Sequence, residues 1–315
     1  MRRSSVTVML VIALLGAALV PAAGAAPTQD RGRSRSGVTE GQSIDTTFRM
    51  EKGGLVDLQA LSGTIIVTGA SGSDVRIRAS AEQGGVRLRA SSTLATLRTV
   101  SDRGRMRDVR YEVAVPAGIR VLMNTTSGDL SASNVRGDLE IESISSTIKL
   151  QDLSGLVRIE SVSGNITGTG LTGGANIEST SGTISITNAS GDISVENTSG
   201  IIALAGIRSR VVRAESISGD IRFQGDIESD GRYEFSAFSG NVRLTVPESI
   251  GATLTLSTYS GGINSDFPIT LQQGTSTGAD KQLQFRLGSG SARITAESFS
   301  GNIFINRGPG RDRQE

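Results

Sequence analysis

Residues 137–164 read GDLEIESISSTIKLQDLSGLVRIESVSG, and one nine-residue phrase repeats through them. The phrase is Ser-Gly-x-Ile-x-Ile-x-x-Leu, and its glycine position recurs at Gly137, Ser146 and Gly155. The same spacing holds across residues 128–206. A fixed period of this kind indicates a repeat architecture, in which each unit packs on its neighbours. The repeat therefore says more about the fold than about the chemistry.

Each unit contains a short strand. The second and fourth residues after the glycine position are apolar, as in Ile148 and Leu150, and the residue between them is polar. Alternation with a period of two is typical of a strand with one buried face. The seventh residue is apolar or small in most units, for example Ile144 and Leu153. We predict that this seventh residue points inward after a corner.

Two successive units should return the chain to its starting point. The segments Ile-Glu-Ser-Ile-Ser, Ile-Glu-Ser-Val-Ser, Ile-Glu-Ser-Thr-Ser and Val-Glu-Asn-Thr-Ser occupy 141–145, 159–163, 177–181 and 195–199, and the alternate units lack them. This 18-residue beat predicts an all-β fold, a parallel β-solenoid (β-helix) with 18-residue two-strand coils. We expect a right-handed sense and a rise of about 4.8 Å per coil. Capping β segments should flank the stack, because its end strands are otherwise unpaired.

The repeat divides the chain into five expected regions. The β-solenoid, with wider coils toward its C-terminal end, should cover 121–306. An N-terminal β segment or cap is expected over 44–120, where short strands have looser spacing. Residues 26–43 are polar, basic and without periodicity, which predicts a flexible linker. Residues 1–25 are expected to be a signal peptide, and residues 307–315 a disordered tail.

The N-terminus has the parts of a signal peptide. Arg2 and Arg3 precede an apolar run over 6–20, and residues 23–25 (Ala-Gly-Ala) supply a small-x-small cleavage site. The run is too short for a comfortable membrane span, and no second apolar segment follows it. We therefore expect an exported protein that is periplasmic, cell-surface or secreted, with no membrane span in its mature chain.

The composition narrows the possible chemistry. The formal net charge is +1, so no global positive field favours nucleic acid as a partner. The chain has neither cysteine nor histidine, which removes disulfides, thiol nucleophiles, the imidazole base and the commonest zinc ligands. We expect no cofactor, no metal site and no catalytic residue.

The sharpest predicted surface feature is a column of glutamates on one sheet. Spacings of 18, 18, 18 and 19 residues stack the side chains of Glu142, Glu160, Glu178, Glu196 and Glu215, which we call the glutamate ladder. Like charges about 4.8 Å apart repel by roughly 1 kcal/mol in water. Only Arg158 and Arg213 share the face and compensate in part. The five glutamates are candidate ligand-binding residues, and the other interpretation is a solvated acidic face.

A second candidate surface is basic. Segments 75–78 and 86–89 alternate aliphatic residues with arginine, and a Gly-Gly pair between them suggests a hairpin turn. If the segments pair, one sheet face carries Arg76, Arg78, Arg87 and Arg89. Guanidinium groups suit phosphate and carboxylate, so this would be a patch for anionic polymers. The other interpretation is an edge kept soluble by its charge.

Several Ser-Gly phrases carry a family resemblance. They are Ser-Gly-Asp-Leu at 127–130, Ser-Gly-Asp-Ile at 190–193 and 218–221, and Ser-Gly-Asn-Ile at 300–303. Behind the expected signal peptide, they resemble the bacterial exported β-strand-repeat family of unknown function whose members are named as adhesins. The resemblance covers about residues 44–306 and implies a β-solenoid envelope protein. It transfers no catalytic residue, because that family has no such motif to map.

Together these features favour a non-catalytic, exported β-solenoid, an adhesin or scaffold that presents flat sheet faces to envelope or surface ligands. Glycans, envelope surface polymers or another protein are the expected partners. One alternative is a polysaccharide-active β-helix enzyme, although clustered aspartates are missing and the only lysines are Lys52, Lys149 and Lys281. The other alternative is a cation-binding periplasmic sensor or binding module that uses the glutamate ladder.

Overall fold

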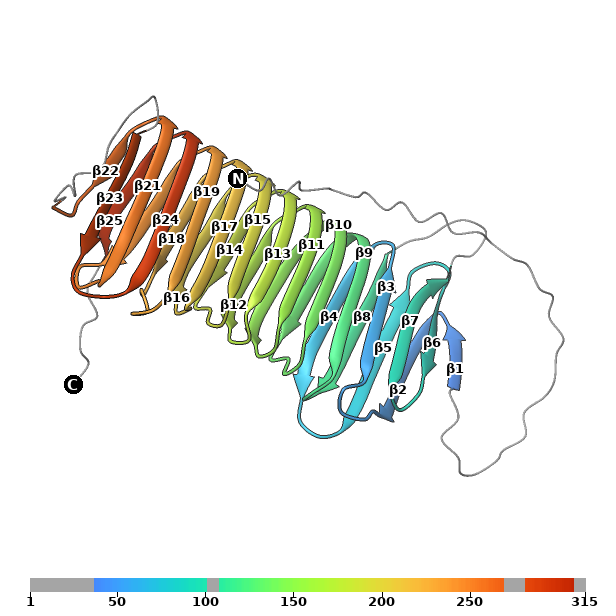
Figure 1. The fold of residues 1–315 in the computed structure, drawn as a ribbon. Helices are drawn as coiled ribbons and strands as arrows, with labels where there is room; N and C mark the ends of the chain where they lie inside the picture. The colour runs from blue at the N-terminus through green and yellow to red at the C-terminus, as the bar shows by residue number, and fades with distance from the viewer. Residues whose placement is uncertain (1–36, 101–107, 269–280, 309–315) are drawn as a thin grey trace, which may run out of the picture. The chain divides into compact units, whose positions relative to one another are not determined.

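The computed structural model describes residues 37–100, 108–268 and 281–308, and every regular element in these ranges is a β-strand (Figure 1). The predicted all-β class is therefore confirmed. The strands pair in two long series, which we call the first ladder and the second ladder. Strands β9 and β10 belong to both ladders, because each continues around a corner of the chain.

Neighbouring strands in space are not always neighbours in sequence. The first ladder contains, in spatial order, β1 (Gly37–Gly41), β6 (Gly85–Ala90), β7 (Leu94–Val100), β3 (Leu55–Ala60), β9 (Arg120–Ser133), β10 (Leu139–Leu153), β11 (Val157–Ser163), β13 (Ala175–Ser181), β15 (Ile193–Ser199), β17 (Val211–Ser218), β19 (Arg232–Ser239), β24 (Ala292–Ser300), β21 (Ala252–Ser260) and β23 (Lys281–Leu287). The second ladder contains β2 (Ser43–Arg49), β5 (Asp74–Ala81), β8 (Val109–Pro116), β4 (Gly63–Ala70), β9, β10, β12 (Ile166–Leu171), β14 (Ile184–Thr187), β16 (Ile202–Ile207), β18 (Ile221–Gly225), β20 (Val242–Pro247), β25 (Ile303–Gly308) and β22 (Ile263–Ser265).

The central strands are parallel and in register. Ile141 pairs with Ile159, and Ile159 pairs with Ile177 on the next strand. Because paired residues are one coil apart, each position of the phrase forms a column along the stack. The inward columns are aliphatic and belong to a single buried core that also includes the N-terminal strands. The arrangement is β-solenoid-like.

The two halves of the repeat end differently, which corrects one prediction. In β10 the alternation runs unbroken through residues 139–144, so that Ser143 is buried and Ile144 is exposed. In the other half, Asp152 has φ 51° and interrupts the alternation, and Leu153 is buried. The prediction that the seventh residue points inward is correct for Leu153 and wrong for Ile144.

The corners between the ladders stack on each other. Gly182 has φ 116°, and a Cβ at this position would overlap the backbone oxygen of Gly164 on the preceding corner. Farther along the stack, Asp220 Oδ1 accepts the backbone N–H of Asn241 at 3.0 Å. Asn241 Oδ1 in turn accepts the backbone N–H of Asn302 at 3.0 Å. The Ser-Gly-Asp/Asn phrase is thus explained by close packing and hydrogen bonding at one corner.

Antiparallel strands close the N-terminal end of both ladders. β1 pairs with β6 and β6 with β7 in the first ladder, while β2 pairs with β5 and β5 with β8 in the second. β1 corrects the linker prediction, because residues 37–41 are a strand that covers the free edge of β6. The last residue of the expected linker, Ser43, begins β2. Residues 26–36 of that linker and the expected signal peptide lie outside the described residues.

At the C-terminal end, the last strands of the chain insert into the stack. β24 lies between β19 and β21, and β25 lies between β20 and β22 (Figure 1). β23 pairs antiparallel with β21 on its outer edge. The wide spacing of the Ser-Gly phrases in this region therefore reflects an excursion of the chain. Residues 307–308, which were expected in the tail, end β25, and residues 309–315 lie outside the described part.

Candidate functional site

The structure brings the five predicted glutamates into one column. Glu142, Glu160, Glu178, Glu196 and Glu215 are consecutive Cα partners on β10, β11, β13, β15 and β17. Each occupies an outward position of its strand, because the residues on either side of it are buried. Glu297 lies in the same column, separated from Glu215 by Ser236 of β19.

The charges in this column are only partly balanced. Glu215 Oε1 lies 2.6 Å from an Arg213 Nη atom, and Arg213 also approaches Glu234 at 3.8 Å. By contrast, Glu160, Glu178 and Glu196 form no ion pair with any described residue. Partial burial raises the pKa of Glu142 above its ordinary value, and the neighbouring charges of Glu160, Glu140 and Asp57 add to the effect. The column is therefore a strip of mutually repelling carboxylates.

A row of exposed side chains, apolar apart from three threonines, runs beside the glutamates. Each lies two residues after the glutamate position of its strand and therefore on the same face of the first ladder. The row, which we call the ridge, consists of Leu61, Thr126, Ile144, Val162, Thr180, Thr198, Ile217, Phe238, Phe299 and Tyr259. The signal for the ridge was present in the sequence, because counting the strand alternation one step farther places Ile144 outward.

The ridge ends in three stacked aromatic rings. Phe299 of β24 stacks on Phe238 of β19 with centroids 4.9 Å apart and on Tyr259 of β21 with centroids 4.8 Å apart. The planes deviate from parallel by only 1° and 2°. All three side chains are about half exposed, at 57% for Phe238, 47% for Phe299 and 48% for Tyr259. The inserted strand β24 thus completes a large exposed aromatic surface.

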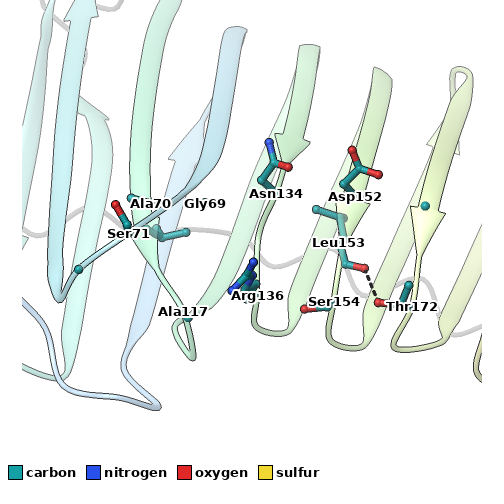
Figure 2. Close-up of a pocket in the computed structure, with 13 residues that line it drawn as sticks. Gly69, Ala70, Ser71, Ala117, Asn134, Arg136, Asp152, Leu153, Ser154 and Thr172 are labelled. Carbon is teal, nitrogen blue, oxygen red and sulfur yellow. Dashed lines mark hydrogen bonds between the residues drawn. The ribbon is translucent and has the colours of Figure 1, made fainter.

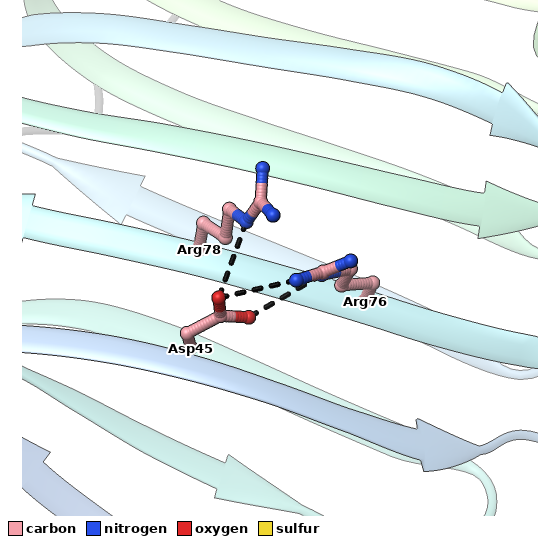
Figure 3. Close-up of polar contacts among 3 residues, drawn as sticks. All are labelled: Asp45, Arg76 and Arg78. Carbon is pink, nitrogen blue, oxygen red and sulfur yellow. Dashed lines mark hydrogen bonds and ion pairs between the residues drawn. The ribbon is translucent and has the colours of Figure 1, made fainter.

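The basic patch does not form as predicted. The two arginine segments are β5 and β6, and they do not pair, since β5 lies in the second ladder and β6 in the first. Arg76 and Arg78 both contact Asp45 of β2, with closest distances of 3.2 Å and 3.3 Å (Figure 3). The Arg76 guanidinium, more than Arg78, holds the pKa of the Asp45 carboxyl below its ordinary value.

The other two arginines belong to the edge of the first ladder. Arg87 pairs with Glu40 of β1 at 2.8 Å, and Arg89 is exposed on the same strand. The four arginines therefore divide between two strand pairs, and three of them have carboxylate partners. Their arrangement fits the interpretation of charged edge strands better than that of one patch for an anionic polymer.

A shallow groove of about 650 Å³ lies where β4 and β8 end against the corners of β9 and β10 (Figure 2). Its ionisable lining side chains are Arg136 and Asp152, both exposed. Thr172 at its rim donates a hydrogen bond to the backbone oxygen of Leu153 at 3.2 Å. The groove was not predicted, because it depends on where β4 leaves the stack. Its lining residues include no pair of carboxylates and no nucleophile with an adjacent base.

In residues 37–100, 108–268 and 281–308, no group of three or more acidic, histidine or cysteine side chains is placed to hold a metal ion. Those ranges also contain no helix long and apolar enough to cross a membrane.

Comparison with known proteins gives a family match. Residues 173–306 match the family model Toastrack DUF4097. A structure described as a "putative cell adhesion protein" from Clostridium sporogenes ATCC 15579 is similar over 84% of this chain and 100% of its own, with 10% identity and a TM-score of 0.26. A "putative adhesin" from Bacteroides fragilis NCTC 9343 is similar over 84% of this chain and 96% of its own, with 14% identity and a TM-score of 0.41. No curated protein matches this chain. The resemblance inferred from the Ser-Gly phrases, to a domain of unknown function named for adhesins, is confirmed.

Proposed function

We propose that this chain, whose residues 173–306 match the Toastrack family, is a non-catalytic, exported adhesin or scaffold that presents flat sheet faces to envelope or surface ligands. The observation that carries the proposal is the register of the outward side chains. Glu142, Glu160 and Glu178 recur at one position per strand, and so do the members of the ridge. A row of equal, weak contacts gains strength from effective concentration, because each bound site holds the next one close.

The proposed location and partners follow from the same interpretation. Export by the signal peptide would bring the chain to the periplasm, the cell surface or the medium. Glycans, envelope surface polymers or another protein are the proposed partners, with the glutamate ladder as the proposed ligand-binding surface. The four arginines are not part of this surface, since three of them are paired at the N-terminal strands.

We also propose right-handed coils, each made of two strands and two of the repeat units. In support, Ile141, Ile159, Ile177 and Val195 are successive partners at a constant interval of two units. The interval lengthens slightly between Val195 and Ala214, where the wider coils are proposed to begin. Parallel strands joined by a crossover are right-handed in about 98% of cases. An experimental density map would show left-handed crossovers if this assignment is wrong.

A binding screen tests the proposed function. The purified chain would be applied to arrays of glycans, to isolated cell-wall polymers and to envelope proteins, and its retention measured. Saturable retention on at least one class, without release of products, is the expected result. Retention on none of them, with a folded chain verified by circular dichroism, would remove the adhesin proposal.

The groove gives a specific reason to keep a polysaccharide-active enzyme as a second candidate. It is the kind of concave site in which a chain of sugars could lie, and it carries Arg136 and Asp152. An enzyme would release reducing ends from envelope or plant polysaccharides, and Asp152→Asn would slow that release. Release of products by the wild type would overturn the non-catalytic proposal.

Repulsion at Glu142 favours the cation-binding module as a third candidate. Burial raises the pKa of Glu142 most, and the charge of Glu160 adds to the rise; a divalent cation would relieve this second, repulsive contribution. The test is thermal unfolding with and without millimolar divalent cations, in the wild type and in Glu160→Gln with Glu178→Gln. A cation module requires stabilisation of the wild type that the double variant lacks. An identical response in both proteins would eliminate this candidate.

A further inference from the structure

Two columns of different chemistry lie side by side on the first ladder. Glu160 and Val162 are two residues apart on β11, so both side chains leave the same face of the sheet. Glu142 and Ile144 repeat this arrangement on β10, and it recurs on β17. The acidic column and the ridge therefore run together along the stack from β10 to β17.

From β10 to β15 the side chains of both columns are exposed, and the glutamates there form no ion pair with any described residue. Ile144 is 54% exposed and Val162 is 47% exposed, although both are aliphatic. Glu160 and Glu178 form no ion pair with any side chain of the described ranges. Thr180 and Thr198 separate the apolar members Val162 and Ile217 of this exposed row. Exposed apolar side chains bordered by charge are typical of an interaction site rather than of an ordinary surface.

Charge restricts what can cover this face. A second copy that packed the same face against it would bring two glutamate ladders together, and like charges brought close repel. An anionic membrane surface or an anionic polysaccharide would be repelled in the same way. A metal ion would neutralise the carboxylates and leave Ile144 and Val162 exposed to water. The complementary partner is one that carries positive and apolar groups together.

The aromatic end of the ridge argues against neutral sugars as the partner. A sugar ring packs on the open face of an aromatic ring, but the faces of Phe299 are covered by Phe238 and Tyr259. What the stack presents to solvent is chiefly ring edges, which suit contact with aliphatic groups. Glu297 lies two residues before Phe299 on β24, so an acidic group borders the ridge here as well.

We propose that this face of the first ladder binds a polypeptide segment that carries both basic and apolar side chains. Lysine and arginine suit it because their charged ends would reach the glutamates while their aliphatic stems pack along the ridge. Five strands spaced about 4.8 Å apart span roughly 20 Å, which an extended segment of about six residues would cover. The inference rests on the proposed binding function and names the partner for the same surface.

The experiment measures the binding of a fluorescent peptide of about ten residues in which lysine and valine alternate. Binding to the purified chain is followed by fluorescence anisotropy at low and at physiological ionic strength. Two comparison peptides replace all lysines by glutamate or all valines by serine. Saturable binding of the lysine–valine peptide is expected, and it should weaken as salt increases because exposed charges are screened.

Two double variants separate the columns. Glu160→Gln with Glu178→Gln removes charge, and Ile144→Thr with Val162→Thr removes apolar surface. Threonine already occupies the ridge at Thr180 and Thr198, so the second variant should fold. Each double variant should raise the Kd of the lysine–valine peptide by about tenfold. Their matched control, Asp74→Asn with Glu82→Gln, removes the same charge at the two ends of β5 in the second ladder and should bind normally.

Four results would overturn the inference. If both double variants bind the peptide as tightly as the wild type does, the peptide binds elsewhere. If the lysine–serine peptide binds as tightly as the lysine–valine peptide does, the attraction is by charge alone. A dimer that dissociates on Ile144→Thr with Val162→Thr would assign the ridge to a second copy of the chain. If the peptide fails to bind while the chain is still retained on envelope material, only this inference fails and the proposed function stands.

Discussion

The ring of Phe238 stacks on that of Phe299, with centroids 4.9 Å apart and planes parallel within 1°. The two residues come from β19 and β24, and β20 to β23 lie between these strands in the chain. They meet because β24 inserts beside β19, where Ala237 pairs with Ser298. The exposed ridge is therefore continuous across a point where the order of strands in space departs from their order in sequence.

Replacing a corner glycine should show how tightly neighbouring repeats pack. Gly182→Ala would place a Cβ against the backbone oxygen of Gly164 and would force a non-glycine residue to φ 116°. The strain alone is about 1–3 kcal/mol, and the backbone overlap adds to it. We expect a lower free energy of unfolding in urea.

Gly72→Ala is the matched control for the corner glycine. Gly72 has a similar φ of 107°, but nothing lies within 4 Å of the added Cβ. Gly72→Ala should therefore cost only the conformational strain, less than Gly182→Ala. Equal costs at the two positions would contradict close stacking of the corners.

Ser143 and Ser216 are both buried, but their replacement by alanine should change the stability of the protein by different amounts. Ser143 Oγ donates a hydrogen bond to Ser146 Oγ at 2.6 Å, and both side chains are buried. Ser143→Ala leaves Ser146 without this partner and should cost about 1–3 kcal/mol. Ser216 Oγ is buried without a hydrogen-bond partner among the described residues. Ser216→Ala should therefore be neutral or stabilising. Urea unfolding of both variants measures the two free energies of unfolding, and a larger loss in Ser216→Ala than in Ser143→Ala would contradict this account.

Neutralising Glu142 should stabilise the protein at neutral pH. The folded state raises the pKa of Glu142 through partial burial and the charges of Glu160, Glu140 and Asp57. Ionisation is therefore less favourable in the folded chain than in the unfolded chain, and the loss of stability appears as pH rises through the raised pKa. Glu142→Gln should increase the Tm at pH 7. The difference should vanish well below the ordinary pKa of 4.5, and a difference independent of pH would contradict the repulsion.

Tyr111 should ionise later than an ordinary tyrosine. Burial raises its pKa to about 12, although a hydrogen bond between its hydroxyl and Thr99 acts in the opposite direction. The neutral phenol is favoured in the folded state, so this contribution to stability is complete below pH 10.0 and is lost as pH rises toward about 12. Burial also raises the pKa of Tyr233, so absorbance of tyrosinate measured against pH should contain late transitions from two tyrosines. Tyr111→Phe should remove the one near pH 12 and leave that of Tyr233, and an unchanged titration curve would contradict the burial of Tyr111.

The sequence predicts the repeat well because each column depends on local spacing. The glutamate ladder follows from a nearly constant interval of two repeat units, and every one of its members lies where the spacing places it. Ile144 of the ridge was predicted to point inward, because the corner of the chain was expected before this residue. Continued alternation after Ser143 contains the needed signal, since Ser143 takes the inward place.

Features that depend on distant pairing could not be predicted in this way. The β5 and β6 segments resemble a hairpin locally, yet Arg76 faces Asp45 of β2 and Arg87 faces Glu40 of β1. The insertion of β24 between β19 and β21 also could not be predicted, because β21 comes before β24 in the chain and carries a Ser-Gly phrase of its own. The groove arises where β4 leaves the stack, which is likewise a consequence of tertiary pairing.

We propose the first ladder, with its glutamates and its ridge, as the binding face. The most direct measurement is retention of the purified chain on isolated cell envelopes, compared among three proteins. One is the wild type, the second is Glu160→Gln with Val162→Thr, and the third is Lys149→Gln with Gln151→Ala on the second ladder. The account predicts that the first-ladder variant loses most of its retention and that the second-ladder variant behaves like the wild type. Equal retention of all three, or loss only in the second-ladder variant, would contradict it.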